Sequence, residues 1–142
     1  MLNGLNGEYM GYTPDVGHLI FGDIDAVEMI KEYRPLIRHV HFKDATYAKE
    51  WKKMGTGDID FKGCVQALVD TDYDGWIMVE EETELAQKET RQVIKDIGEY
   101  VDRELKPIIE AGKQEGLYDR KNKRRELGCL AGSGKVDDTE IV

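Results

Sequence analysis

The sequence predicts an α/β fold in which short strands and amphipathic helices alternate around a parallel sheet. Two segments, 37–43 and 75–80, have the residue content of strands, and apolar residues at helical spacing follow each of them. Asp and Pro residues stand where helices should begin and end. Such alternation is typical of βα units with parallel strands.

The first predicted strand covers Tyr9–Asp15 and should end near Pro14, which cannot donate to a strand ladder. The next helix should begin at Asp25, because an Asp followed three residues later by Glu28 is a capping box. Pro35 should end it, since proline disrupts a helix interior.

The second predicted strand is Ile37–Lys43, followed by a polar loop from Asp44 to Asp58 that contains a very short third strand at Lys52–Met54. Asp60 is the expected cap of another helix. That helix has four apolar residues at helical spacing: Phe61, Cys64, Val65 and Leu68.

The clearest strand is Gly75–Glu80, and a long helix from Leu85 to Lys106 follows it, ended by Pro107. Residues 1–106 therefore form the predicted folded unit. In residues 107–142 the composition shifts to Gly, Lys and Glu, which predicts one short helix and a mobile tail.

Composition narrows the function classes. The 142 residues have a formal net charge of −9, which argues against nucleic-acid binding. A basic run at 120–125 is flanked by acids and is interpreted as a solvated tail. No segment has the length and apolarity of a membrane span, and the N-terminus lacks a secretory pattern. Cys64 and Cys129 form no CxxC motif, so we expect a cytoplasmic protein.

Polar residues gather at the ends of the predicted strands. Period two places Ile37, His39, His41 and Lys43 on one face of the second strand, and Val40 and Phe42 on the other. His41 is either a site residue or a hydrogen-bonded histidine at the rim of the core.

The two other strand ends carry acids. Glu80 ends an apolar run and has the parity of Trp76 and Met78; the alternative is a solvated acidic strand end. Asp15 and His18 straddle a strand-to-helix turn, and the alternative is an ordinary turn with an incidental histidine.

Together, Asp15, His41 and Glu80 would supply two carboxylates and one imidazole from three strand ends. This donor set suits Mn²⁺ or Mg²⁺, with Co²⁺ or Zn²⁺ as further candidates, and Mn²⁺ is the expected ion. The set is one carboxylate short of a comfortable protein site. Trp51, in the polar loop, is either an aromatic platform for a substrate on a lid or the anchor of a solvated loop.

Four segments in order resemble the second half of the xylose-isomerase-like barrels, which include sugar-phosphate isomerases, sugar epimerases, inosose dehydratase and isomerase, and AP endonuclease. They are Pro14–Leu19, His39–Asp44, Gly55–Phe61 and Tyr73–Glu80. The resemblance implies that residues 1–106 are strands five to eight of a (β/α)8 barrel, a C-terminal half-barrel with a C-terminal extension.

The resemblance also implies roles for single residues. Asp15, His41 and Glu80 would be metal ligands from strands five, six and eight, with Glu80 also the catalytic acid/base. His18 would act in catalysis and hydrogen-bond substrate near the metal, and Lys43 would contact a substrate oxygen. The family's second glutamate, at the end of strand four, has no counterpart in this sequence. AP endonuclease activity is disfavoured, because it needs more histidine ligands than the 3 histidines here provide.

Three functions remain open. The first is a metal-dependent sugar or polyol isomerase/epimerase, present as a fragment that lacks the strand-four glutamate. The second is a non-catalytic half-barrel that binds a metal or a partner protein, and the third is an inosose dehydratase-type lyase. A half-barrel exposes two sheet edges, so we expect a homo-oligomer or a complementing N-terminal half-barrel as partner, with a small-molecule sugar or polyol as substrate.

Overall fold

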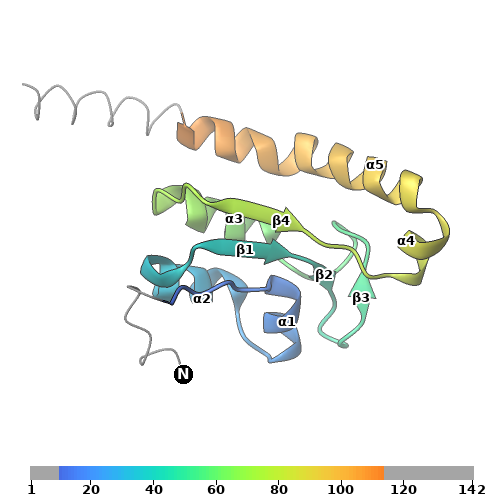
Figure 1. Ribbon diagram of the computed structural model, residues 1–142, viewed down its shortest axis with the longest axis horizontal. Helices are drawn as coiled ribbons and strands as arrows, with labels where there is room; N and C mark the ends of the chain where they lie inside the picture. Colours follow the sequence, from blue (N-terminus) through green and yellow to red (C-terminus); the bar gives the residue numbers. More distant parts are fainter. Residues whose placement is uncertain (1–9, 114–142) are drawn as a thin grey trace, which may run out of the picture.

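Two parallel strands stand at the centre of the fold, β1 (His39–Phe42) and β4 (Trp76–Val79), in a computed structural model that describes residues 10–113 (Figure 1). In their register His41 lies opposite Met78. The segment before the first helix runs parallel to β1 on its other side, through bridges from Tyr12 and Asp15. Three parallel segments therefore lie side by side with β1 in the middle, as the alternation of elements predicts.

The predicted first strand is only partly formed. Its described residues make two isolated bridges, Tyr12 to Ile37 and Asp15 to His41, and no continuous ladder. Pro14 has no N–H to donate, although its carbonyl accepts from the His41 N–H at 2.8 Å. The chain then enters α1 (Val16–Phe21), a helix that the sequence analysis missed.

The predicted helix caps at Asp25 and Asp60 are confirmed. The Asp25 side chain accepts from the backbone N–H of Glu28 and opens α2 (Ala26–Tyr33). Asp60 accepts from the N–H of Gly63 and opens α3 (Phe61–Asp70). These bonds satisfy N–H groups that a helix start leaves without partners. The 3-10 turn η1 (Arg34–Leu36) contains Pro35 and ends the helical segment, as predicted.

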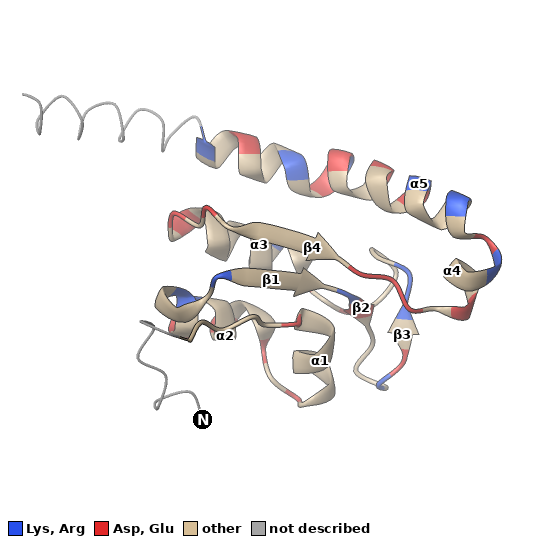
Figure 2. Ribbon diagram, in the orientation of Figure 1, with Lys and Arg blue, Asp and Glu red and all other residues tan. Residues whose placement is uncertain are grey.

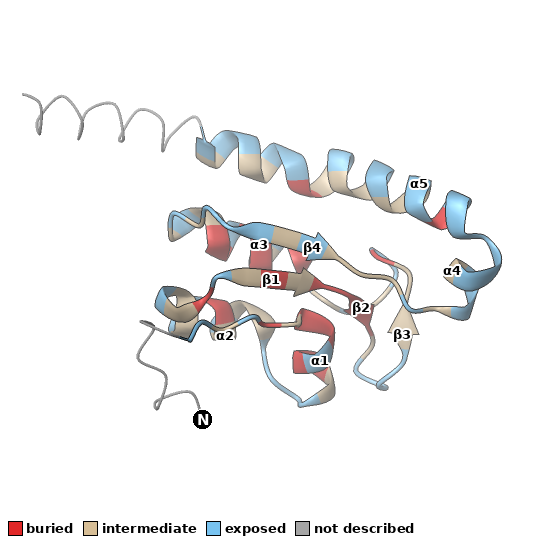
Figure 3. Cartoon of the chain, in the orientation of Figure 1, coloured by how far each residue is buried: buried red, intermediate tan, exposed pale blue. Residues whose placement is uncertain are grey.

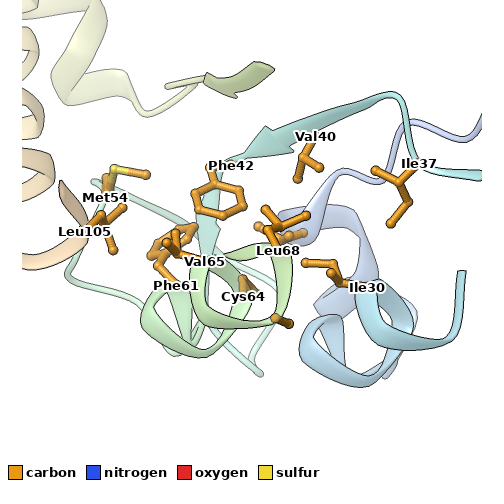
Figure 4. Packing of buried hydrophobic residues seen from close by; sticks show 12 residues of the cluster. Ile30, Ile37, Val40, Phe42, Met54, Phe61, Cys64, Val65, Leu68 and Leu105 are labelled. Atoms are coloured by element: carbon orange, nitrogen blue, oxygen red, sulfur yellow. The ribbon is translucent and has the colours of Figure 1, made fainter. Parts of the chain in front are cut away.

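The hydrophobic core lies between one face of the sheet and helices α2 and α3 (Figures 3 and 4). On β1, Val40 and Phe42 are fully buried, while Ile77 and Val79 of β4 pack against the same cluster. The buried side chains of this cluster include those of Ile30, Ile37, Phe61, Cys64, Val65 and Leu68.

The other face of the sheet is largely uncovered. Trp76 is 79% exposed and Met78 is 46% exposed, and both lie on the face that carries His39 and His41. The period-two assignment of the two strand faces is therefore confirmed for residues 39–42. Ile37, expected on the face of His39 and His41, is instead 1% exposed and belongs to the core cluster, because it precedes the strand. Burial of one face stabilises the fold, and the exposed face leaves room for chemistry or for a further protein layer.

The predicted third strand does not join the central sheet. β3 (Trp51–Lys52) pairs antiparallel with β2 (Asp44–Ala45), so the polar loop contains a small hairpin instead of a further sheet strand. Because β1 and β4 are hydrogen-bonded neighbours, no strand lies between those that carry His41 and Glu80. The expectation that they are strands six and eight, separated by a seventh, does not hold for the described residues.

The predicted long helix is broken near its start and continues beyond its expected end. The chain forms α4 (Glu84–Lys88), then α5 (Thr90–Tyr100) and the π-helical turn η2 (Val101–Leu105). Helical structure runs on to residue 113, so Pro107 does not end it. The N–H of Lys106 bonds to the carbonyl of Val101, and this wider turn accommodates a proline that lacks an N–H.

The rest of the C-terminal prediction lies outside the described residues. The expected tail from residue 114 onward, with Cys129 and the basic run, belongs to that part of the sequence. Between residues 10 and 113, no helix combines the length and the apolarity that crossing a membrane requires.

Candidate metal centre

Three predicted ligands arrive at one edge of the sheet because each ends a parallel segment. Asp15 caps α1, its Oδ1 accepting from the His18 N–H at 3.1 Å. His41 lies in β1, bridged to Asp15 on one side and opposite Met78 on the other. The N–H of Glu80 donates to the carbonyl of Phe42 at 2.9 Å, which places the Glu80 side chain beside His41.

The three side chains form a compact donor set. Asp15, His41 and Glu80 each offer one ligand atom, and these atoms all lie within 4.8 Å of one another. The Nδ1 of His41 is 2.5 Å from the Glu80 Oε1. Their side chains are 20%, 27% and 33% exposed, so a small ion could reach them while bulk water is partly excluded. Two carboxylates and an imidazole fit a divalent ion such as Mn²⁺.

Lys43 lies at the centre of the acidic groups and is only 4% exposed. Its Nζ is 2.9 Å from Glu80 Oε2, 3.2 Å from Glu82 Oε1 and 3.6 Å from Asp15 Oδ2. Figure 2 shows the basic end of β1 beside the acidic segment that follows β4. Burial acts to lower the pKa of Lys43, but the hydrogen bonds that its ammonium donates to Glu80 and Glu82 outweigh burial, so that the pKa is raised.

Glu80 is held in its ionised form. The hydrogen bond from Lys43 lowers the pKa of Glu80, burial opposes this, and the bond from His41 lowers the pKa further. A carboxylate with a lowered pKa is charged at neutral pH. It can therefore bind a cation or accept a proton.

Aromatic rings form a wall next to these groups. Trp51 stacks on Phe21 with ring centroids 4.3 Å apart, and its centroid lies 5.1 Å from that of His18. The Nζ of Lys43 is 4.9 Å from the Trp51 centroid. A Cβ on Gly17 would lie 2.7 Å from both the Trp51 ring and the Lys43 carbonyl oxygen, so glycine is needed for α1 to approach this closely.

All six predicted site residues lie in this one region. His18 contacts Asp15, with 2.8 Å between its Nδ1 and Oδ2, and Trp51 packs against His18 and Lys43. Their roles as metal ligands, acid/base and substrate contacts remain predictions.

Two residues of this region were missed by the sequence analysis. Glu82 pairs with Lys43, and the signal was present, because Glu80 and Glu82 are two residues apart in an extended segment. Asp44 is 2% exposed and accepts from four backbone N–H groups, those of Ala45, Gly55, Thr56 and Gly57. Asp44 and the run 55–57 can both be read from the sequence, but the contact between them cannot.

Comparison with known proteins shows the family of this chain. Residues 1–98 match the family described as xylose isomerase-like TIM barrel. An inosose dehydratase from Bacillus velezensis is 29% identical over 123 residues, which are 74% of this chain and 41% of that protein. An inosose dehydratase from Geobacillus kaustophilus is 30% identical over 70% of this chain and 38% of its own length.

A solved structure is also similar to this chain. The crystal structure of a D-tagatose 3-epimerase-like protein matches with a TM-score of 0.52 and 26% identity, over 71% of this chain and 39% of that one. The chain thus spans about two fifths of the length of these relatives. A family match over residues 1–98, more than half of the sequence, shows that the chain belongs to the xylose isomerase-like TIM barrel family.

Proposed function

We propose that this chain contributes the Asp15–His41–Glu80 part of a divalent-metal site to an enzyme that converts a sugar or polyol by proton transfer next to a carbonyl. The observation that carries the proposal is the placement of three ligand atoms within 4.8 Å, at the ends of three adjacent parallel segments. Carboxyl ends of strands are where barrel enzymes build their active sites.

The side chains suggest a division of roles. A bound divalent ion would polarise substrate oxygens and make the neighbouring C–H more acidic. Glu80, held ionised by Lys43, would accept the proton from that carbon. His18 and Lys43 would donate hydrogen bonds to substrate oxygens, and the Trp51 wall would restrict how a small polyol sits beside them.

Two reaction types fit this chemistry. The relatives described as inosose dehydratases favour loss of water, in which proton removal next to a carbonyl is followed by departure of a hydroxyl from the neighbouring carbon. The D-tagatose 3-epimerase-like relative favours epimerisation or isomerisation, in which a proton returns to carbon. Assaying the chain with its complementing partner on an inosose and on a ketohexose would separate the two by their products.

We further propose that the chain works as a C-terminal half-barrel, with the remaining barrel residues supplied by an N-terminal half or by a second copy. The chain spans about two fifths of its relatives, and the sheet face that carries His41 leaves Trp76 79% exposed. A barrel closed by further strands would cover this face. Sedimentation at high dilution tests assembly with a second copy, since a stable monomer would contradict it.

Metal titration is the direct test of the site. We expect Mn²⁺ to bind with micromolar affinity in calorimetry and His41→Ala to abolish binding. The matched control is His39→Ala, because His39 lies two residues earlier on the same strand face, its ring 4.9 Å from that of His41, and outside the ligand set. Binding unaffected by His41→Ala, or lost equally with His39→Ala, would contradict the proposed site.

A metal- or partner-binding role without turnover is the other candidate function. The sheet face that leaves Trp76 79% exposed, where a partner protein could pack, favours it. Metal binding that persists while the assembled protein converts neither substrate would support this function over catalysis.

A further inference from the structure

The Lys43 ammonium is shared between two predicted ligands and one carboxylate outside the ligand set. Its Nζ lies 2.9 Å from Glu80 Oε2 and 3.6 Å from Asp15 Oδ2. It also lies 3.2 Å from Glu82 Oε1, and the Glu82 side chain is 54% exposed whereas that of Lys43 is 4% exposed. Glu82 therefore links the buried Lys43 ammonium to the protein surface.

An ammonium in this position opposes metal binding in two ways. It repels a second cation through a region where exclusion of water makes charge interactions stronger. It also hydrogen-bonds Glu80 Oε2, one of the two oxygens that this carboxylate can offer to a metal. Any group that draws Lys43 away from Glu80 and Asp15 therefore strengthens binding of the metal.

We infer that Glu82 is a positioning residue that competes with the ligand carboxylates for the Lys43 ammonium and so sets the affinity of the site for a divalent cation. The inference rests on the proposed metal site. With Glu82 present, three carboxylates balance one ammonium and one divalent ion. Without Glu82, Lys43 would turn fully onto Asp15 and Glu80, and the metal-bound site would carry an excess positive charge.

A double-variant cycle tests this inference on the full chain, with Mn²⁺ dissociation constants measured by calorimetry. Glu82→Gln should weaken Mn²⁺ binding about tenfold, the range known for residues that support metal ligands. Lys43→Met should strengthen it. Glu84→Gln is the matched control, because Glu84 lies in the same acidic stretch, is 88% exposed and pairs with Lys88 instead of Lys43.

The combined variant separates positioning from simple attraction. If Glu82 acts through Lys43, Glu82→Gln should change Mn²⁺ affinity less than about threefold in the Lys43→Met background. An undiminished loss in that background would show direct attraction of the metal by Glu82 and would overturn the inference. Glu82→Asp, which keeps the charge, should retain most of the affinity, whereas a purely structural role would not follow charge.

A metal-free measurement tests the Lys43–Glu82 contact itself. Acylation of lysines, followed by peptide mapping, should modify Lys43 slowly in the unsubstituted chain and several-fold more slowly in Glu82→Gln, because Lys43 then turns onto Asp15 and Glu80, with Glu84→Gln unchanged. Equal rates in all three proteins would overturn the positioning role. If the unsubstituted chain binds no Mn²⁺, the proposed metal site fails and the inference with it. Binding that is insensitive to Glu82→Gln contradicts the inference alone.

Discussion

Replacing Asp44 by alanine should destabilise the chain more than any other single change in the polar loop. Asp44 is 2% exposed, and its carboxylate accepts from Ala45 through one oxygen and from Gly55, Thr56 and Gly57 through the other. It therefore ties the end of β1 to the segment that leads into α3. A Cβ on Gly57 would lie 2.3 Å from the same carboxylate, which shows how closely the two segments approach.

The size of the loss in stability depends on whether each backbone N–H can find another acceptor after the substitution. Gly55 and Thr56 are exposed, so water can replace their lost partner. Ala45 is buried and Gly57 is partly buried, and an unpaired buried N–H costs about 1–3 kcal/mol. Removing a buried carboxylate also removes its desolvation cost. We therefore expect Asp44→Ala to lower the free energy of unfolding by about 3 kcal/mol.

Urea denaturation at neutral pH, followed by circular dichroism, measures this loss. Asp58→Ala is the matched control, since Asp58 accepts one described hydrogen bond, from the N–H of Tyr47 at an exposed position, and should cost under about 1 kcal/mol. Asp44→Asn should also destabilise, because its amide group cannot accept at both ends. A loss for Asp44→Ala no larger than that for Asp58→Ala would refute the reasoning.

Three further predictions concern the core, the buried thiol and acid stability. Phe42→Ala should cost about 3–5 kcal/mol, and Phe42→Leu much less, in the same urea assay, because Phe42 is fully buried against Phe61. Burial raises the pKa of Cys64 to about 12, so peptide mapping should find it unmodified by a thiol reagent at pH 8 until urea unfolds the chain; modification in the folded state would contradict this. The pKa of Glu80 is lowered from its ordinary 4.5, chiefly by Lys43, so its contribution to stability is present above that pH and lost as pH falls through the lowered value. Lys43→Met should therefore flatten the fall of unfolding free energy between about pH 5 and 3, and an unchanged slope would count against the pairing.

Local patterns in the sequence were sufficient for the strand faces and for two helix starts. The side chains of His39 and His41 alternate with those of Val40 and Phe42, as in any strand. This alternation can therefore be predicted without knowing which segments lie beside the strand. The caps at Asp25 and Asp60 depend on residues three positions away. For the same reason α1 could have been found, because Asp15 caps it and Val16, Leu19 and Ile20 have helical spacing.

Contacts between distant segments could not be predicted in this way. Nothing local shows that β1 pairs directly with β4, or that Trp51 pairs within a hairpin. Lys43 and Glu82 are brought together only by that strand pairing. Pro107 can lie within a helix because the turn at 101–105 is wider than an α-helical turn. The expectation that proline ends an ordinary α-helix does not take such a turn into account.

The candidate site and the core depend on one shared register. On β1 the core side chains Val40 and Phe42 alternate with His39 and His41, and the Glu80 N–H is bonded to the carbonyl of Phe42. A shift of one residue would expose Phe42 and bury His41, so the burial that stabilises the sheet also fixes where the ligands lie. The two faces are nevertheless separable by substitution, because His41→Ala removes a predicted ligand without touching the apolar cluster, while Phe42→Ala does the reverse. Loss of metal binding with retained stability in the first variant, and loss of stability in the second, is what this division of the strand requires.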